Sequence, residues 1–155
     1  MTDSDRLKLV ALDEEDLAVL SAHVQDAVLK VADLVYLAKE RRFVIAMNRF
    51  TWEEAGRQKR GYERRRAALT FDRVSSVKTS HIRRDRGEAV LDLLAVKFES
   101  GDAPAGAVHL IFAGGGAVRL EVECIEGRLA DLGTAWATPA KPSHDLDSNE
   151  TKSAG

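Results

Sequence analysis

The sequence predicts an α+β domain with about seven mostly antiparallel strands and a helix at each end. Apolar residues recur every three or four positions near the N-terminus, every second position through the middle, and every three or four positions again near residue 130. The chain has 155 residues, of which 45% are hydrophobic, and this is enough for one domain with its own core. We expect a single globular domain over residues 1–137 and a disordered C-terminal tail over residues 138–155.

The first element is a predicted helix over residues 13–29. Asp13 suits the N-cap position, and the acidic residues 14–16 that follow it suit the positive end of a helix dipole. The spacing of the apolar residues then predicts one buried stripe on an amphipathic helix. The stripe consists of Leu17, Leu20, Val24, Ala27 and Val31.

The middle of the chain is predicted to form strands joined by short turns. Residues 33–38 and 42–50 are rich in β-branched and aromatic residues and indicate a hairpin. A long polar connection is expected over residues 51–65. The next strands are expected at 67–71, 75–83 and 89–98. In the last of them the apolar residues switch from one face of the strand to the other, which indicates a β-bulge or burial on both faces.

The clearest hairpin covers residues 107–124 around the glycines at 114–116. If those glycines form the loop, Phe112 faces Val118, Leu110 faces Leu120 and Val108 faces Val122. All three pairs are apolar, so this register buries one continuous face. On the other face, His109 is then expected opposite Glu121.

The apolar residues Ile125, Leu129, Leu132 and Trp136 return to helical spacing and predict a short C-terminal helix. Seven antiparallel strands closed by such a helix form the layout of a pleckstrin-homology-like (PH-like) barrel. An open α+β sheet with two helices on one face would give the same pattern of elements. Residues beyond Thr138 are almost free of apolar side chains, which is typical of a disordered segment.

The composition predicts a cytoplasmic protein. Cys124 is the single cysteine, so an intramolecular disulfide is impossible and a reducing compartment fits. The first ten residues are polar and acidic, unlike a secretory signal. No apolar run approaches the ~20 residues that a membrane-spanning helix needs. We therefore expect no membrane span.

Three segments carry the family resemblance: "RFVIAMNRFTWE", "RRRAALTFDRVSSVKTSHI" and "GGGAVRLEVECIEGRLADLG". In these segments the chain resembles an alphaproteobacterial family designated domain of unknown function 2948. The resemblance extends from Leu7 to about Trp136. It implies a bacterial cytoplasmic protein, and it carries no activity, ligand or catalytic residue over to this chain.

Positive charge is concentrated in the middle of the chain. Residues 1–40, 41–100 and 101–155 carry balances of −5, +7 and −4, which together give the overall charge of −2. Arginines beside Trp52 and Tyr62 suit phosphate contacts and base stacking. The candidate anion-binding residues are Lys39, Arg41, Arg42, Arg57, Lys59, Arg60, Arg64, Arg65 and Arg66.

The opposing interpretation of these residues is a solvated loop. Its arginines would pair with nearby glutamates and with the acidic N-terminal helix, at little gain in stability. The near-neutral total charge also argues against a dedicated nucleic-acid binder, for which a basic domain is expected.

Three other features have weaker claims to function. His109 opposite Glu121 could act as a general base, but a cross-strand polar pair explains the two residues equally well. Cys124 continues the apolar face of its strand and is expected to be a buried thiol. The glycines at 114–116 lead into a strand, so a turn is expected there and not a phosphate-binding loop.

The sequence therefore favours a non-catalytic binding or adaptor module for a protein partner. The alternative is an anion-binding module for nucleic acid or a phosphorylated ligand, acting through the basic loop at residues 57–66. An enzyme built around His109 and Glu121 is the third class. We expect no metal and no cofactor, since the chain has no motif with their ligand spacing. Self-association is compatible with the sequence.

Overall fold

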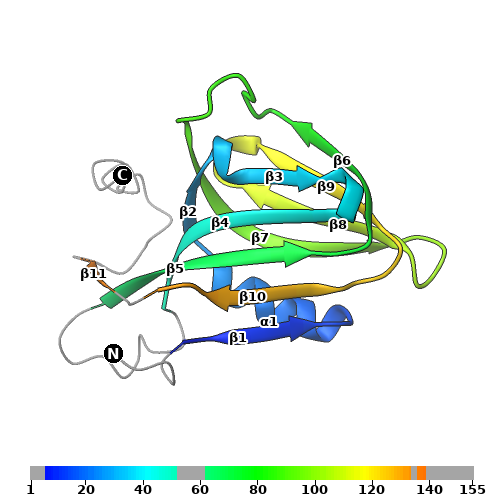
Figure 1. Cartoon of the computed structure of the whole chain (residues 1–155), viewed down its shortest axis with the longest axis horizontal. Coiled ribbons are helices and arrows are strands. Elements are labelled where there is room, and N and C mark those ends of the chain that lie inside the picture. The colour runs from blue at the N-terminus through cyan, green and yellow to red at the C-terminus, as the bar shows by residue number, and fades with distance from the viewer. Residues whose placement is uncertain (1–5, 52–61, 134–135, 139–155) are drawn as a thin grey trace.

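The computed structural model describes residues 6–51, 62–133 and 136–138, which form one large antiparallel sheet and one α-helix (Figure 1). The strands outnumber the seven that the sequence predicts. Within these residues the elements are β1 (Lys8–Ala11), α1 (Glu14–Val24), β2 (Ala27–Lys30), β3 (Leu34–Leu37), β4 (Arg42–Phe50), β5 (Tyr62–Phe71), β6 (Val74–Ser80), β7 (Val90–Ser100), β8 (Gly106–Phe112), β9 (Ala117–Val122), β10 (Gly127–Asp131) and β11 (Trp136–Thr138).

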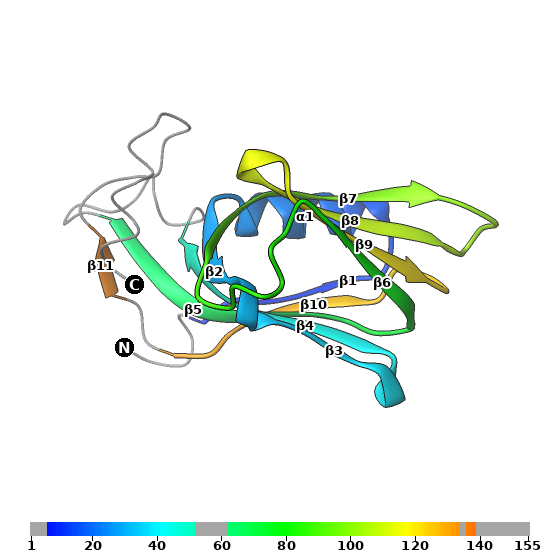
Figure 2. The same cartoon turned by 90° about the horizontal axis from the view of Figure 1, so that it is seen from above.

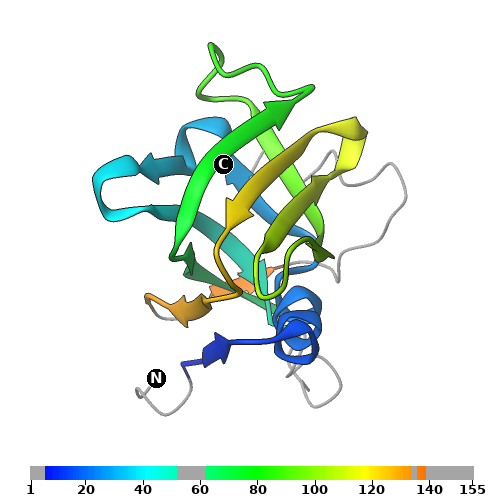
Figure 3. The same ribbon diagram turned by 90° about the vertical axis from the view of Figure 1, so that its right-hand side faces the viewer.

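The sheet is open, so the prediction of a PH-like barrel is wrong. Its strand order is β1-β10-β5-β4-β2-β7-β8-β9-β6, and the two end strands, β1 and β6, do not pair with each other. One edge of β4 is shared by β3 and β2, and one edge of β5 is shared by β10 and β11. The sheet bends so that β7–β9 lie across from β3, β4 and β10 (Figures 2 and 3).

Helix α1 confirms the predicted N-terminal helix but is shorter. The side chain of Asp13 accepts a hydrogen bond of 2.8 Å from the backbone N–H of Asp16, as an N-cap does. The helix ends at Val24 because Asp26 adopts a positive φ of 65°, outside the helical region. Of the rest of the predicted apolar stripe, Ala27 is a buried residue of β2 and Val31 begins the short 3₁₀ helix that follows this strand.

The C-terminal helix predicted over residues 125–136 is not present. Residues 127–131 form β10, which lies between β1 and β5. The buried positions of β10 are Gly127, Leu129 and Asp131. Because glycine and aspartate are not apolar side chains, the sequence does not show the alternation of apolar residues that is typical of a strand. A Cβ at Gly127 would lie 2.7 Å from the ring of Phe71, so this strand position requires glycine. Leu132, assigned to the helix stripe, is 53% exposed.

The hairpin of β8 and β9 is confirmed, but its register differs from the prediction by two residues. Leu110 pairs with Val118 and Val108 pairs with Leu120. The loop is residues 113–115, closed by a hydrogen bond from Phe112 N–H to the Gly116 carbonyl. A two-residue shift keeps each side chain on its face. Leu110 and Leu120 are therefore fully buried as expected, whereas His109 faces Arg119 and not Glu121.

Two other expectations for the strands are confirmed. Residues 34–37 and 42–45 pair as the first hairpin, and β7 changes register at a bulge between Leu93 and Ala95. The core lies inside the bend of the sheet and is covered on one side by α1, which packs mainly on β7. The Ser21 hydroxyl accepts a hydrogen bond of 2.9 Å from the backbone N–H of Val96 and joins the two elements.

Candidate functional site

Two of the three basic residues predicted at the first hairpin turn lie in ion pairs. A guanidinium nitrogen of Arg41 lies 2.5 Å from a Glu123 carboxylate oxygen, and Arg42 Nε lies 2.7 Å from Asp72 Oδ1. They form one side of an open hollow whose other charged residues are Glu40, Arg73, Glu126 and Arg128. Four arginines and four carboxylates line this hollow, so its charge is balanced. Lys39, in the exposed turn, has no ion pair within the described part of the chain.

The second predicted group, Arg64–Arg66, lies within β5. Arg64 and Arg65 are 8% and 1% exposed, whereas Arg66 is partly exposed and donates to the Asn48 side chain. Burial lowers the pKa of Arg64, against the opposing effect of Asp92 and Asp26. Arg57, Lys59 and Arg60 lie outside the described residues.

The two predicted groups of basic residues are far apart. Arg42 begins β4, and Arg64 pairs with Phe50 at the other end of the same strand. At about 3.3 Å per residue, eight steps along β4 separate them by roughly 26 Å. The structure therefore does not bring the hairpin turn and Arg64–Arg66 into one site.

A buried ion cluster joins β4, β5 and β10. Arg49 donates to both carboxylate oxygens of Asp131, at 2.8 and 2.9 Å, and both side chains are fully buried. Arg65 lies beside Arg49 in the β4–β5 register, with its Nε 3.9 Å from the same carboxylate. Asp131 also accepts a hydrogen bond of 2.8 Å from the N–H of Leu7. The cluster therefore links β4, β5 and β10 to the residue that precedes β1.

His109 belongs to a surface cluster across β7, β8 and β9. Its Nε2 lies 2.8 Å from Glu99 Oε1, which also accepts a hydrogen bond of 2.9 Å from Arg119. These two hydrogen bonds hold the pKa of Glu99 below its ordinary value. Arg119 also binds Glu121, the residue predicted to face His109. Cys124 is partly exposed and not buried as predicted.

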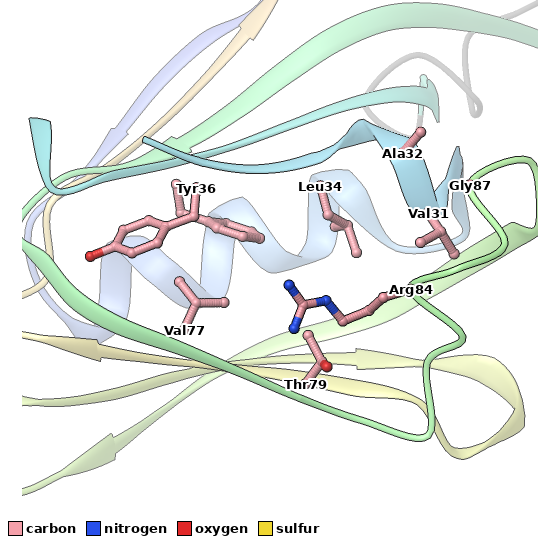
Figure 4. A pocket seen from close by; sticks show the side chains of 9 residues that line it. Val31, Ala32, Leu34, Tyr36, Val77, Thr79, Arg84 and Gly87 are labelled. Atoms are coloured by element: carbon pink, nitrogen blue, oxygen red, sulfur yellow. The ribbon is translucent and has the colours of Figure 1, made fainter. Parts of the chain in front are cut away.

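An apolar cavity of about 290 Å³ lies between the β3–β4 hairpin and β6 (Figure 4). Tyr36 presents its ring to the cavity, while its hydroxyl donates a hydrogen bond of 2.8 Å to the Val74 carbonyl. The remaining lining residues are Val31, Ala32, Leu34, Phe43, Val77, Thr79, Arg84 and Gly87.

The cavity exists because the sheet is open at this place. Strand β6 begins against the hairpin, where Val74 N–H donates to the Arg41 carbonyl at 2.9 Å and Val74 accepts from Tyr36. Further along, β6 pairs with β9 alone, and β3 pairs with β4 alone. The two edges therefore separate, and the inward side chains of both strands line the space between them.

The segment 81–89 closes one end of the cavity and carries Arg84 into it. Two hydrogen bonds hold this segment to the short 3₁₀ helix Val31–Asp33: Val31 N–H donates to Ala89 at 2.9 Å and Ala32 N–H donates to Gly87 at 3.0 Å. In Figure 4 the guanidinium of Arg84 points from this segment into the space between Leu34 and Thr79. Arg84 is exposed to solvent at the mouth of the cavity, and within the described residues it has neither a hydrogen bond nor an ion pair.

The sequence analysis missed this cavity. Its residues come from four separate segments, and no motif or spacing connects them. Alternation alone could have indicated which side chains of residues 34–37 and 75–80 point inward. Their closeness depends on the bend of the sheet, which alternation does not predict.

The fold and this cavity define a mostly antiparallel β protein with an open, bent sheet and an apolar cavity that contains one arginine. The chain belongs to the family described as "Protein of unknown function (DUF2948)", whose model matches residues 7–144. No curated protein and no solved structure matches the chain in the comparisons made with them. The family resemblance expected from the sequence is thereby confirmed, apart from its alphaproteobacterial origin.

The described residues offer neither a helix suited to span a membrane nor a cluster suited to hold a metal ion. None of their helices combines the length and apolar character that spanning a membrane demands. The same residues contain no group of three or more histidine, cysteine, aspartate or glutamate side chains arranged to hold a metal ion.

Proposed function

We propose that this protein is a binding module that holds a small ligand in the cavity between the β3–β4 hairpin and β6. The observation that carries the proposal is a mostly apolar cavity lined by Arg84, a solvent-exposed residue whose guanidinium points toward the cavity and has no protein partner among the described residues. Ligand sites are typically concave and mostly apolar, with a few polar groups that fix orientation. The proposal keeps the predicted class of binding module but gives it a small ligand in place of the predicted protein partner.

The volume and the lining residues of the cavity limit the size and the chemistry of the ligand. Its volume of about 290 Å³ is at the lower end of the roughly 300–1,000 Å³ that ligand sites occupy. Leu34, Phe43 and Val77 supply aliphatic and aromatic contacts, so an apolar body gains free energy by leaving water. The charged hollow at Arg41 and Arg42 is of similar size, but its charges are already paired.

A titration followed by amide NMR tests this proposal. Octanol, octanamide and octanoate are added separately to the full chain, and we expect at least one of them to shift amides of the cavity residues. Val77→Phe should fill the cavity and abolish these shifts. Lys78→Phe is the matched control, because Lys78 is exposed on the opposite face of the same strand. If none of the three compounds binds, or if Val77→Phe has no more effect than Lys78→Phe, the proposal is wrong.

A protein partner is a second candidate, as the sequence analysis favours. Its support is β1, an end strand of the sheet: Val10 in this strand and Leu12 directly after it are 60% and 63% exposed. Exposed strand edges accept a further strand from another chain. A partner recovered in stoichiometric amount after nuclease treatment, and lost with Leu12→Lys, would support this candidate.

The anion-binding alternative concerns Lys39, Arg41 and Arg42 together with the arginines of residues 57–66. Against it, Arg41 and Arg42 are in ion pairs and Arg64 and Arg65 are buried. Affinity for a short oligonucleotide that falls steeply with salt would support it. Absence of binding at low salt would remove it.

A further inference from the structure

We infer that the ligand of the cavity is a small amphipathic carboxylate, bound with its carboxylate on Arg84 and its apolar body against Leu34, Tyr36 and Val77. This inference rests on the proposed function and deepens it by naming the chemical class of the ligand. Its basis is the direction of one guanidinium and the chemistry of the surrounding walls.

Arg84 supplies the positive charge for the ligand. The neighbouring Arg83 turns to Asp85, with which it shares two hydrogen bonds of 3.2 and 3.3 Å, whereas Arg84 makes no ion pair in the described part of the chain. A guanidinium is planar and always charged, and its fork of N–H donors matches the two oxygens of a carboxylate. Thr79 also lines the cavity and lies below the guanidinium in the view of Figure 4.

The walls beyond the guanidinium select an apolar body. Figure 4 shows Leu34 above the guanidinium, with Val77 and Tyr36 further into the cavity, in the direction in which the guanidinium points. The Tyr36 hydroxyl is directed away from Arg84 and is already bonded to Val74, so its ring and not its hydroxyl would contact the ligand. A compact polyanion would leave these apolar walls exposed to water, whereas a carboxylate with a short hydrocarbon chain would cover them.

The charge of the cavity also argues for an anion with a single carboxylate. Arg84 is the one charged residue among the nine that line it. An amine would meet repulsion from this guanidinium. A neutral ligand would gain no more than a weaker hydrogen bond, because bonds between charged partners are roughly twice as strong.

The test compares ligands of the same length and different head groups on the full-length protein. Octanoate, octanamide and octylammonium are titrated by calorimetry into the wild type. We expect octanoate to bind at least tenfold more tightly than octanamide, and octylammonium not to bind. The tenfold figure corresponds to about 1.4 kcal/mol, the low end of a hydrogen bond to a charged group.

Three variants identify the arginine responsible. Arg84→Gln should lose at least tenfold in octanoate affinity and leave octanamide affinity unchanged, and Arg84→Lys should recover part of the loss. Arg83→Gln is the matched control, because Arg83 is the adjacent arginine and is already paired with Asp85. It should bind octanoate as the wild type does.

The outcomes separate the inference from the proposed function. If octanoate and octanamide bind equally to the wild type and to Arg84→Gln, the cavity binds ligands but the arginine only covers apolar surface with its stem. The inference then fails and the proposed function stands. If neither compound binds the wild type, the inference fails, and if octanol does not bind either, the proposed function fails with it. If Arg83→Gln loses as much affinity as Arg84→Gln, the assignment of the carboxylate to Arg84 is wrong.

Discussion

At the scale of the residue, the basic side chains have three different environments. Arg42 is half-exposed and pairs with Asp72, Arg49 is fully buried on Asp131, and Arg84 enters an apolar cavity. Exposed pairs contribute little to stability, whereas breaking a buried pair is costly because one charge remains in the core. The position of an arginine in the fold therefore determines its role more than its position in a basic run does.

Asp131→Asn should destabilise the protein by about 3–5 kcal/mol, because it removes the one carboxylate that Arg49 and Arg65 share in the core. The measurement is the free energy of unfolding in urea. Asp85→Asn is the control, since Asp85 pairs with Arg83 on the surface, and it should change stability by less than about 0.5 kcal/mol. Equal effects of the two substitutions would contradict the structural role of the buried cluster.

At the scale of the element, cross-strand neighbours link the long strands β7, β8 and β9. Glu99 on β7 accepts hydrogen bonds from His109 on β8 and Arg119 on β9, so one carboxylate spans three strands. His109 and Arg119, which both bind Glu99, are paired with each other in the register of β8 and β9. This cluster is solvent-exposed and its contribution depends on pH.

Glu99→Gln should lower stability slightly at pH 7 and have no effect at low pH. The pKa of Glu99 is lowered from its ordinary value of 4.5, so the folded state favours the charged form. The stabilisation is present above that ordinary value and is lost as the pH falls through the lowered pKa. Melting temperatures of the wild type and the variant, measured at pH 7 and near pH 3, check this. A difference that persists at low pH would show another cause.

At the scale of the whole molecule, the open sheet creates both the cavity and the exposed edges. A barrel would join its end strands, whereas here β1 and β6 end the sheet and β3 separates from β6 beyond Val74. The last strand, β11, ends at Thr138, where the sequence predicts that the tail begins. The independence of that tail from the fold remains a prediction.

Deleting residues 139–155 should leave the melting temperature within about 1 °C of the full chain, because this segment has little apolar area to bury. Thermal unfolding of the two chains, followed by circular dichroism, checks this expectation. A clear decrease would mean that the segment packs on the domain.

Much of the fold could be predicted from local pattern. The helix after Asp13, the first hairpin, the bulge in β7 and the burial of Leu120 follow from capping and alternation. The short strands β1, β2, β10 and β11 could not be predicted, because three to five residues carry too little periodic signal. In β10, glycine and aspartate occupy buried positions, so the apolar residues that remain imitate a helix.

The sequence predicted a basic anion-binding site, whose described residues proved to be dispersed, and it did not predict the cavity. Arg41 and Arg42 lie roughly 26 Å from Arg64 along β4. Arg84, the arginine of the cavity, was not among the candidates. Adjacent basic residues in a strand point to opposite faces, so a run of arginines divides between environments when the strand enters a sheet.

The sequence by itself determined which residues alternate, which faces are apolar and where the helix begins, because these depend on neighbours a few positions apart. Only the tertiary structure decided that the sheet stays open, that Asp131 meets Arg49, and that Arg84 enters a cavity beside Leu34 and Val77. The physical reason is the distance along the chain. The pairing of distant strands and the bending of the sheet depend on the packing of the whole core. The sequence also does not show whether a given arginine will contact water, a carboxylate or an apolar wall.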